Sequence, residues 1–485
     1  MTSLAHFRKS LKSPTLIADL RAGLIGDGLP FETPFGVRNL LYADYVASGR
    51  ALRQVESFVL EQVLPFYANS HTEASFCGGT MTRLRGEARR QIAEYVNAGA
   101  DCHTVFTGSG ATSGINRIVR LLGIPERLAQ GQRVTVLIGP YEHHSNILPW
   151  RESGAQVTQI GLSPDGTIDL QHLDAELAQT SRKDLVVGAF SAGSNVTGVL
   201  TDTDSITRRL KSAGALAVWD YAAVAPYVAM DMGEGELAKD AIVFSPHKFP
   251  GGPGASGVMV IRDSLCLQDR PTAPGGGSVS FVSPWGHHYN QRVEAREEAG
   301  TPNILGDIRA ALAMIVKHAV GIDAIHQRET ELRRRALDHW QQLPGLRLLG
   351  VSPTAEALPI FSFQVNQPDG ALVHHQLFTK MLSDVHGIQA RGGCACAGPY
   401  AHFLLGIDER RSAEVYQALL HGREIEKPGW VRLNFSYLHS DAQAQRIIDA
   451  VADLAHNAGR WIPRYEVDEA SARFSARPVS AAVAS

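Results

Sequence analysis

The amino-acid sequence predicts an α/β protein in which a mainly parallel sheet is followed by a smaller α+β domain. Two observations support this prediction. Between residues 102 and 262, short apolar, β-branched runs alternate with longer stretches of helical periodicity, which is typical of a parallel sheet wrapped by helices. After a Gly/Pro-rich stretch at residues 271–278, the pattern changes to a long helical segment and then to mixed strands and helices.

Five segments of the first region are predicted to be strands buried on both faces, because each is nearly continuous in apolar residues. They are residues 134–139, 185–191, 215–220, 241–245 and 257–262. A long helical segment is predicted from about residue 304 to 343, where helix breakers are few. The final third, residues 346–462, contains the predicted strands 360–365 and 430–435 among helical stretches.

These elements divide the chain into four parts. Residues 1–40 are expected to form an N-terminal segment that packs on the small domain, and residues 41–325 form the large domain. Residues 326–465 form the small C-terminal α+β domain. Residues 466–485 are rich in Ala, Ser and Arg, and we expect them to be disordered.

Bulk composition restricts the class of protein. Apolar residues make up 44% and charged residues 20%, with a formal net charge of −3, so no broad positive field exists for nucleic-acid phosphates. No apolar stretch approaches the roughly 20 residues of a membrane-spanning helix, and the N-terminus lacks the apolar core of a signal peptide. Five cysteines in a chain this long indicate reduced thiols. We therefore expect a cytoplasmic protein whose partners are small molecules.

Two segments that follow predicted strands suggest a site for a carbonyl cofactor. Lys248, in the sequence Ser-Pro-His-Lys, precedes a glycine-rich turn, and partial burial there would lower the pKa of its amine and make it nucleophilic. Taken alone, the same lysine also suits an ordinary surface turn. Asp220 ends the preceding strand, at the edge where open α/β sheets bind ligands. A buried carboxylate needs a cation, which the protonated pyridine nitrogen of pyridoxal 5′-phosphate (PLP) would supply.

A glycine-rich segment and a histidine pair add to this site. Residues 107–116 place small and hydroxyl residues, including Ala111 and Thr112, at the start of a predicted helix, where free backbone N–H groups bind phosphate. His143, just after a predicted strand, could stack on a flat cofactor ring and carry protons near neutral pH. Paired histidines also suggest a metal, but no second ligand set with zinc-like spacing accompanies them, so we predict no metal site.

Four motifs together resemble the cysteine desulfurase and selenocysteine lyase branch of the class V aminotransferase-like PLP enzymes. They are Glu142-His143-His144-Ser145-Asn146, Asp220, Ser245-Pro246-His247-Lys248 and Ala299-Gly300-Thr301-Pro302-Asn303. The resemblance covers about residues 41–454. It implies PLP fold type I, with a seven-stranded, mainly parallel sheet in the large domain, and a homodimer with shared active sites.

The resemblance also implies which side chains hold the cofactor ring. Lys248 would form the Schiff base with PLP, Asp220 would pair with the pyridine nitrogen, and His143 would stack on the ring. Asn195 matches a family position beside the phenolic oxygen of the cofactor. The family usually places a glutamine three residues after the aspartate, to hydrogen-bond that oxygen, whereas this chain has Ala223. The hydrogen bond is therefore missing or comes from another group.

The cofactor phosphate has its own implied ligands. Thr112, Ser245 and His247 would hold it, beside the helix start that includes Ala111. Thr301 would reach the phosphate in the partner subunit's site, because the family is dimeric.

The segment 391–399 (Arg-Gly-Gly-Cys-Ala-Cys-Ala-Gly-Pro) bears on which reaction PLP would support. It resembles the desulfurase loop, in which the nucleophilic cysteine follows an arginine by five residues, and this spacing selects Cys396 after Arg391. The flanking glycines let a sulfur approach a bound ligand, so that a thiolate could attack the substrate's sulfur and keep it as a persulfide. A metal half-site and a redox pair with Cys394 are alternatives, and Cys394 could also accept the persulfide.

Arg432 is the candidate ligand for the substrate carboxylate. It lies in the predicted strand 430–435, at the position where the family places its carboxylate-binding arginine. A guanidinium offers two parallel N–H donors to a carboxylate, although an edge-strand arginine that faces water is the alternative. Arg391 and Asn195 are the other predicted substrate contacts.

These residues predict a PLP-dependent cysteine desulfurase that converts L-cysteine to L-alanine and passes sulfur through a persulfide on Cys396 to an acceptor protein. Selenocysteine is a second candidate substrate. The alternatives are a C–S lyase or class V aminotransferase on a larger amino acid, with Cys396 as a bystander, and a catalytically silent scaffold or sulfur-transfer adaptor. Molybdenum-cofactor sulfurases share the Gly-Cys-x-Cys pattern, but we expect no room for their extra C-terminal domain after Tyr465.

Overall fold

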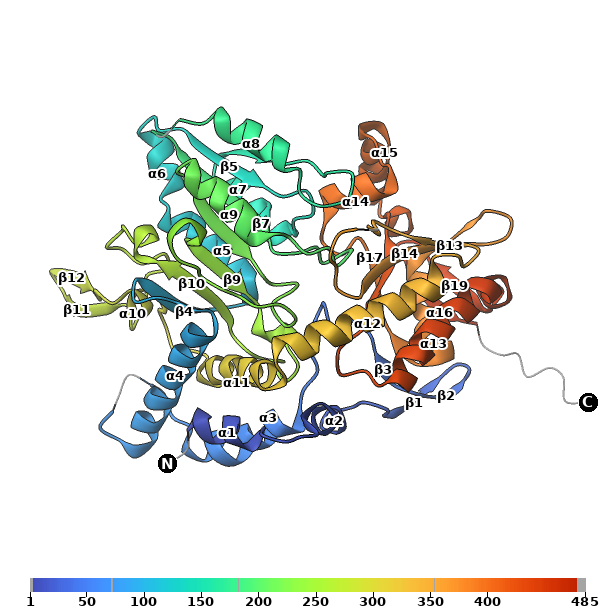
Figure 1. The fold of residues 1–485 in the computed structure, drawn as a ribbon, viewed down its shortest axis with the longest axis horizontal. Coiled ribbons are helices and arrows are strands. Elements are labelled where there is room, and N and C mark those ends of the chain that lie inside the picture. The colour runs from blue at the N-terminus through green and yellow to red at the C-terminus, as the bar shows by residue number, and fades with distance from the viewer. Residues whose placement is uncertain (1–2, 71–72, 182, 353, 478–485) are drawn as a thin grey trace, which may run out of the picture.

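The computed structural model describes residues 3–70, 73–181, 183–352 and 354–477, and its largest element is a seven-stranded sheet (Figure 1). The strands are β4 (Cys102–Gly108), β5 (Val134–Ile138), β6 (Gln156–Gln159), β7 (Leu185–Ser191), β8 (Leu216–Asp220), β9 (Ala241–Phe244) and β10 (Gly257–Arg262). Their order is β4-β10-β9-β8-β7-β5-β6. The pairs from β9 to β6 are parallel, and β10 is antiparallel to both neighbours. The predicted α/β class with a mainly parallel sheet is therefore confirmed.

Helices cover both faces of this sheet, because successive side chains of each strand point to opposite faces. In β10, Val258 joins the hydrophobic cluster that includes α11 (Ile304–Val320), whereas Met259 joins the cluster that includes α5 (Gly110–Leu121). The other helices of this region are α4 (Phe76–Tyr95), α6 (Ile124–Ala129), α7 (Leu148–Glu152), α8 (Leu170–Ala178), α9 (Thr203–Ser212) and α10 (Val293–Glu297). Burial on both faces explains why the central strands are apolar throughout.

The helical segment predicted for residues 304–343 is in fact two helices. The first, α11, ends before Gly321, and α12 (Ile322–Trp340) begins directly after it. Gly321 has a φ of +89°, which glycine adopts at low cost because it lacks a Cβ. The break turns the chain, so that α12 leads from the large sheet toward a second sheet (Figure 1).

The second sheet has five strands and holds the thiol-containing segment at one edge. Its strands are β13 (Leu346–Leu348), β14 (Ile360–Asn366), β15 (Leu372–Val373), β17 (Arg391–Gly393) and β18 (Trp430–Asn434). The order is β13-β14-β18-β17, all antiparallel, with β15 also paired to β14. One hydrophobic cluster joins this sheet to α13 (His375–His386) and α16 (Asp441–Trp461). The helices α14 (Gly398–Leu405) and α15 (Glu409–Leu420) follow the thiols.

The N-terminal segment differs from the prediction in what it packs against. Its first helix, α1 (Leu4–Ser10), contacts α4 and α11 of the large-sheet region. Later parts of the segment do reach the small-sheet region. In the hairpin of β1 (Pro30–Thr33) and β2 (Gly36–Asn39), β2 contacts α13. Arg21 Nε donates to Leu438 O at 2.7 Å, and Gln443 Nε2 on α16 donates to the Asp27 carboxylate at 2.8 Å. The expectation that the whole segment packs on the small domain is wrong for α1, because buried Leu4 and Phe7 complete the large hydrophobic cluster.

The C-terminal segment is also more ordered than predicted. The strands β19 (Tyr465–Asp468) and β20 (Arg473–Ala476) form an antiparallel hairpin, so the expectation of disorder is wrong for residues 466–476. Tyr465 is buried, and its hydroxyl donates to the carboxylate of Asp384 over 3.2 Å, which anchors the hairpin on α13. Residues 478–485 lie outside the described residues. Among the residues that are described, no helix has the length and apolarity needed to cross a bilayer.

Candidate active site

A cavity of about 270 Å³ lies where the carboxyl ends of β7, β8 and β9 meet the loop after β17. The sequence-predicted residues that line it are Ala111, Thr112, His143, Asn195, Asp220, Ser245, His247, Lys248, Arg391, Cys396 and Arg432. Thr301 is exposed and does not line the cavity. Its implied role requires a second subunit and stays a prediction.

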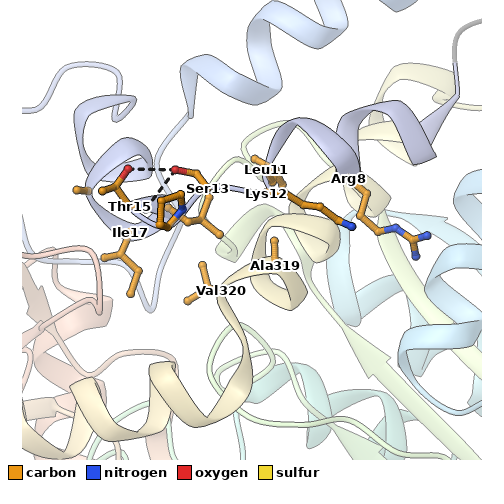
Figure 2. Close-up of a pocket in the computed structure, with 11 residues that line it drawn as sticks. Arg8, Leu11, Lys12, Ser13, Thr15, Ile17, Ala319 and Val320 are labelled. Atoms are coloured by element: carbon orange, nitrogen blue, oxygen red, sulfur yellow. Dashed lines mark hydrogen bonds between the residues drawn. The ribbon is translucent and has the colours of Figure 1, made fainter.

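A second hollow lies between the N-terminal helices and the end of α11 (Figure 2). Two cations, Arg8 and Lys12, line it together with small, hydroxyl and apolar residues. Ser13 and Thr15 at its edge hydrogen-bond each other at 3.0 Å. Its lining contains no carboxylate, histidine or cysteine, so the cavity at the sheet is the better candidate for catalysis.

Lys248 lies on the short turn Pro246–Lys248 that follows β9, half-buried at the cavity wall. Burial lowers the pKa of its amine from 10.5 to about 8, against the opposing attraction of Asp220. A lowered pKa makes the neutral, nucleophilic amine available near physiological pH. The neutral form of this amine is therefore a minor fraction at pH 7, but a much larger fraction than for an ordinary lysine, which favours imine formation.

Asp220 ends β8 and is buried at the floor of the cavity. One carboxylate oxygen accepts a hydrogen bond from the Ala222 backbone N–H at 2.8 Å. Burial raises the pKa of Asp220, while that hydrogen bond and Lys248 oppose the shift. A cation placed against this carboxylate would relieve the cost of burying its charge.

The start of α5 has the backbone geometry expected of a phosphate-binding site. Gly110 opens the helix with a φ of +66°, and a Cβ there would lie 2.9 Å from the Ser245 hydroxyl. A Cβ on Gly257 would lie 2.5 Å from the Gly110 backbone, so both positions require glycine. The Ala111 N–H donates to the Ser245 hydroxyl at 3.0 Å. A helix N-terminus with its dipole and a hydroxyl group thus converge on one corner of the cavity, as an anion requires.

Thr112 and His247 complete that corner. The Thr112 hydroxyl hydrogen-bonds the Ser145 hydroxyl at 2.7 Å, which links α5 to the histidine motif. Burial, and secondarily the nearby Lys248, lowers the pKa of His247 to about 4. The imidazole is therefore neutral at pH 7 and would contribute a hydrogen bond to an anion instead of a full charge.

His143 lines the cavity wall next to the short turn His144–Asn146. Its Nδ1 accepts the Ser145 backbone N–H at 3.1 Å, so the neutral ring carries its proton on Nε2. Burial, with the positive charge of Lys248, lowers the pKa of His143 to about 4. The motif is held by buried Glu142, which accepts from Asn146 Nδ2 at 2.7 Å and from the Ser191 backbone N–H at 2.8 Å.

Asn195 has an unsatisfied acceptor in the cavity wall. Its Nδ2 donates to Ala395 O at 2.8 Å, and its backbone oxygen accepts from Arg432 Nη1 at 3.2 Å. Its Oδ1 is buried without a hydrogen-bond partner. Such an orphaned atom is costly unless a ligand supplies a donor. Ala223 also lines the cavity and offers only a methyl group where the family has a glutamine.

Asp44 is the functional residue that sequence reasoning missed. Its two carboxylate oxygens accept from Arg432 Nη2 and from Arg391 Nε, each at 2.9 Å. The two arginines are cross-strand partners in β17 and β18, and Arg432 Nε is buried without a partner. The available signal was one acid in segment 42–49, which otherwise holds mainly apolar and small residues.

The thiol loop lies between β17 and α14. Cys396 is exposed and lines the cavity, whereas Cys394 is half-buried and does not line it. Burial lowers the pKa of the Arg391 guanidinium, but the charge of the Asp44 carboxylate and its hydrogen bond to Arg391 outweigh this effect and raise the pKa above its usual value. Within the ranges that the structure describes, no group of three or more His, Cys, Asp or Glu side chains could hold a metal ion.

Comparison with known proteins agrees with this geometry. The Aminotransferase class-V family model matches residues 41–413. A cysteine desulfurase of an Enterobacter species is 32% identical over 369 residues, 75% of this chain and 86% of that protein. A probable cysteine desulfurase of Streptomyces coelicolor is 30% identical over 383 residues, 78% and 88% of the two chains.

Solved structures show the same fold. The apo cysteine desulfurase of Thermococcus onnurineus superposes with a TM-score of 0.70 at 23% identity, over 86% of this chain and 94% of that one. The cysteine desulfurase CsdA of Escherichia coli gives a TM-score of 0.68 at 23% identity, over 90% and 98% of the two chains. At this level of identity, the likeness speaks for the fold alone.

Proposed function

Because this chain belongs to the class V aminotransferase family, we propose that it is a PLP-dependent cysteine desulfurase that converts L-cysteine to L-alanine. The observation that carries the proposal is the meeting of Lys248, Asp220 and Cys396 in one cavity, although they lie on different elements. The cavity thus combines an amine of lowered pKa, a buried acid and an exposed thiol. A transaminase or a lyase has no need of the thiol.

The lining fits PLP. The start of α5, with Ser245, would bind the phosphate, and the Asp220 carboxylate would pair with the protonated ring nitrogen. The Asn195 Oδ1, buried without a partner, marks a place where a bound group must donate a hydrogen bond. When bound, PLP supplies an electron-poor ring that accepts the electrons of a broken substrate bond. Lys248 would hold the cofactor and would carry protons to and from the substrate.

Arg432 would grip the substrate carboxylate. Its Nε, orphaned in the described structure, is a free donor, and Asp44 fixes the guanidinium plane through Nη2. With the carboxylate held, the substrate's sulfur can approach Cys396 on the opposite loop. The Cys396 thiolate attacks that sulfur, the substrate C–S bond breaks, and a proton returns to the carbon. L-cysteine and the thiol thereby become L-alanine and a persulfide on Cys396.

The decisive experiment replaces Cys396 with serine. We expect alanine formation from L-cysteine to fall by at least about 10³-fold, as when an enzyme loses its nucleophile. Mass spectrometry of the wild-type peptide should show one added sulfur that is absent from the Cys396→Ser protein. Cys77→Ser is the matched control, since Cys77 lies on α4 and does not line the cavity. A Cys396→Ser protein that still turns over cysteine, with pyruvate as product, would make the enzyme a C–S lyase.

Replacement of Arg432 by lysine tests the carboxylate contact. Lysine keeps the charge but loses the planar pair of donors, so we expect KM for L-cysteine to rise about 10–100-fold, with a smaller change in kcat. Steady-state kinetics measure both constants. The control is Arg423→Lys at an exposed position on the surface. An unchanged KM would show that the carboxylate binds elsewhere.

Three further features belong to the proposal. Thr301 is assigned to the phosphate site of the partner subunit in a homodimer, which agrees with its exposure in the single chain. The sulfur on Cys396, an exposed residue, is assigned to a sulfur-acceptor protein. The protein is assigned to the cytoplasm, where its thiols stay reduced.

A further inference from the structure

Cys394 and Cys396 lie on a single tight turn. The Ala397 N–H donates to Cys394 O at 3.1 Å, and the two residues between them, Ala395 and Cys396, have φ values of +53° and +55°. Positive φ at both central positions defines a type I′ turn. Each non-glycine residue in that region costs roughly 1–2 kcal/mol. A turn of this kind persists only where its surroundings hold it.

The surroundings do hold the turn. The Ala395 carbonyl accepts from Asn195 Nδ2 at 2.8 Å, and the Cys396 carbonyl accepts from the His144 N–H at 2.9 Å. His144 Nε2 in turn accepts the Gly398 N–H at 2.8 Å. Burial, with the nearby Arg151, lowers the pKa of His144, so its ring is neutral and can accept. The backbone is thus fixed, while both thiols stay free.

The turn brings the two cysteines within reach of each other. Consecutive Cα atoms are about 3.8 Å apart, so residues two positions apart are separated by at most about 7.5 Å, and a turn shortens this further. Disulfides need a Cα separation of about 4.4–6.8 Å. Cys396 lines the cavity, whereas Cys394 packs against the hydrophobic cluster beside it. Cys396 therefore faces the substrate site, and Cys394 lies outside the cavity, two positions earlier in the same turn.

The other thiols are unsuited to a role at this site. Cys77 lies on α4, Cys102 begins β4 and Cys266 follows β10, and none of the three lines the cavity. Burial raises the pKa of Cys266 to about 12 and also raises that of Cys102, so both are protonated at neutral pH.

We propose that, when no acceptor protein takes the sulfur, Cys394 acts as a resolving thiol that releases it from Cys396 as inorganic sulfide. The inference rests on the proposed desulfurase function, because it begins from the Cys396 persulfide. The Cys394 thiolate attacks Cys396 Sγ, the bond to the terminal sulfur breaks, and that sulfur leaves as hydrosulfide with both electrons of the bond. The two cysteines are oxidised to a disulfide, which a small-molecule or protein dithiol then reduces.

Chemistry favours attack on Cys396 Sγ over attack on the terminal sulfur. Hydrogen sulfide is a stronger acid than an alkyl thiol, and in thiol–disulfide exchange the group with the lower pKa leaves faster. Attack on the terminal sulfur would expel the Cys396 thiolate instead and move the persulfide to Cys394. The two outcomes differ in the sulfur content of the peptide and can be distinguished.

The test supplies L-cysteine to the PLP-loaded full-length protein without any added reductant. After quenching with an alkylating reagent, mass spectrometry reads the peptide that holds both cysteines, and alanine and sulfide are measured in parallel. We expect wild-type protein to contain a Cys394–Cys396 disulfide and to release one sulfide per alanine, with turnover resuming when a dithiol is added. In Cys394→Ser and Cys394→Ala, the sulfur should stay on Cys396, and sulfide per alanine should fall at least about tenfold.

Each other result has a defined meaning. Wild-type protein that forms alanine but keeps a persulfide on Cys396, with Cys394 alkylated, overturns the resolving role and leaves the desulfurase proposal intact. A persulfide found on Cys394 overturns it as well and makes Cys394 a relay. Absence of both alanine and added sulfur in wild-type protein overturns the desulfurase function and this inference together. The wild-type measurement stands alone if a Cys394 variant fails to fold, and Cys77→Ser is the matched control.

Discussion

Replacement of Lys248 by alanine should leave a folded protein that neither traps PLP covalently nor forms alanine from cysteine. The lysine is the amine at the cavity wall whose pKa burial lowers to about 8, and we propose it as both the nucleophile for the aldehyde and the proton carrier. Proton transfer by a positioned side chain alone contributes about 10²–10⁴-fold. We therefore expect at least that loss of activity, together with loss of the absorption band of the protonated imine.

Borohydride reduction gives the sharpest readout for Lys248. Wild-type protein should yield a stable adduct on the peptide that contains Lys248, and Lys248→Ala should yield none. Lys12→Ala is the matched control, because Lys12 lines the separate hollow near the N-terminus and not the cavity. An adduct of equal yield on another lysine in the Lys248→Ala protein would refute the assignment of this amine.

Replacement of Asp220 by asparagine should have the second largest effect. Asparagine has nearly the same shape and keeps an oxygen for the Ala222 N–H, but it cannot pair with a protonated ring nitrogen. Removal of one partner of a buried ion pair costs about 3–5 kcal/mol, which corresponds to about 10²–10⁴-fold in kcat/KM. We expect a loss of that size, with cofactor retained more weakly. Asp338→Asn, at an exposed position on α12, is the control.

In the cofactor-free protein, we expect the Asp220→Asn substitution to leave thermal stability unchanged or to raise it. Burial raises the pKa of Asp220, so its charged form destabilises the folded state at pH values above the raised pKa. Asparagine removes that charge, and the cofactor-free variant should unfold at the same or a higher temperature than cofactor-free wild type. The gain in thermal stability on adding PLP should shrink. An unchanged gain would mean that Asp220 does not contact the cofactor.

The bounds of the central strands were predicted within about one residue. These strands are buried on both faces, so each is a continuous apolar run that can be recognised in the sequence without reference to its neighbours. Two strands of the seven-stranded sheet were not singled out. One is β6, a short edge strand with the polar ends Gln156 and Gln159, and the other is β4, an edge strand that begins with the half-buried Cys102 and His103. Edge strands pair on one side only, so their sequences carry a weaker apolar signal.

The candidate site was predictable wherever its chemistry is local. Asp220 ends a strand, and Lys248 and the start of α5 come shortly after one, so the sequence motif and the position in the fold coincide. Asp44 was not predictable in this way. It lies 347 positions from Arg391 and 388 from Arg432, and only the folded chain brings the three side chains together.

By itself, the sequence determined the fold class, the cofactor-binding motifs and the spacing that separates Arg391 from Cys396, because hydrophobic periodicity and strand-end motifs act over a few residues. Only the tertiary structure decided that Asp44 joins both arginines, that Gly321 divides the long helical segment, and that Cys394 and Cys396 share a strained turn. These features depend on packing and hydrogen bonds between segments hundreds of residues apart, such as Asn195 with Ala395. Local sequence patterns carry no record of such contacts, since their free energy arises only when the chain is folded.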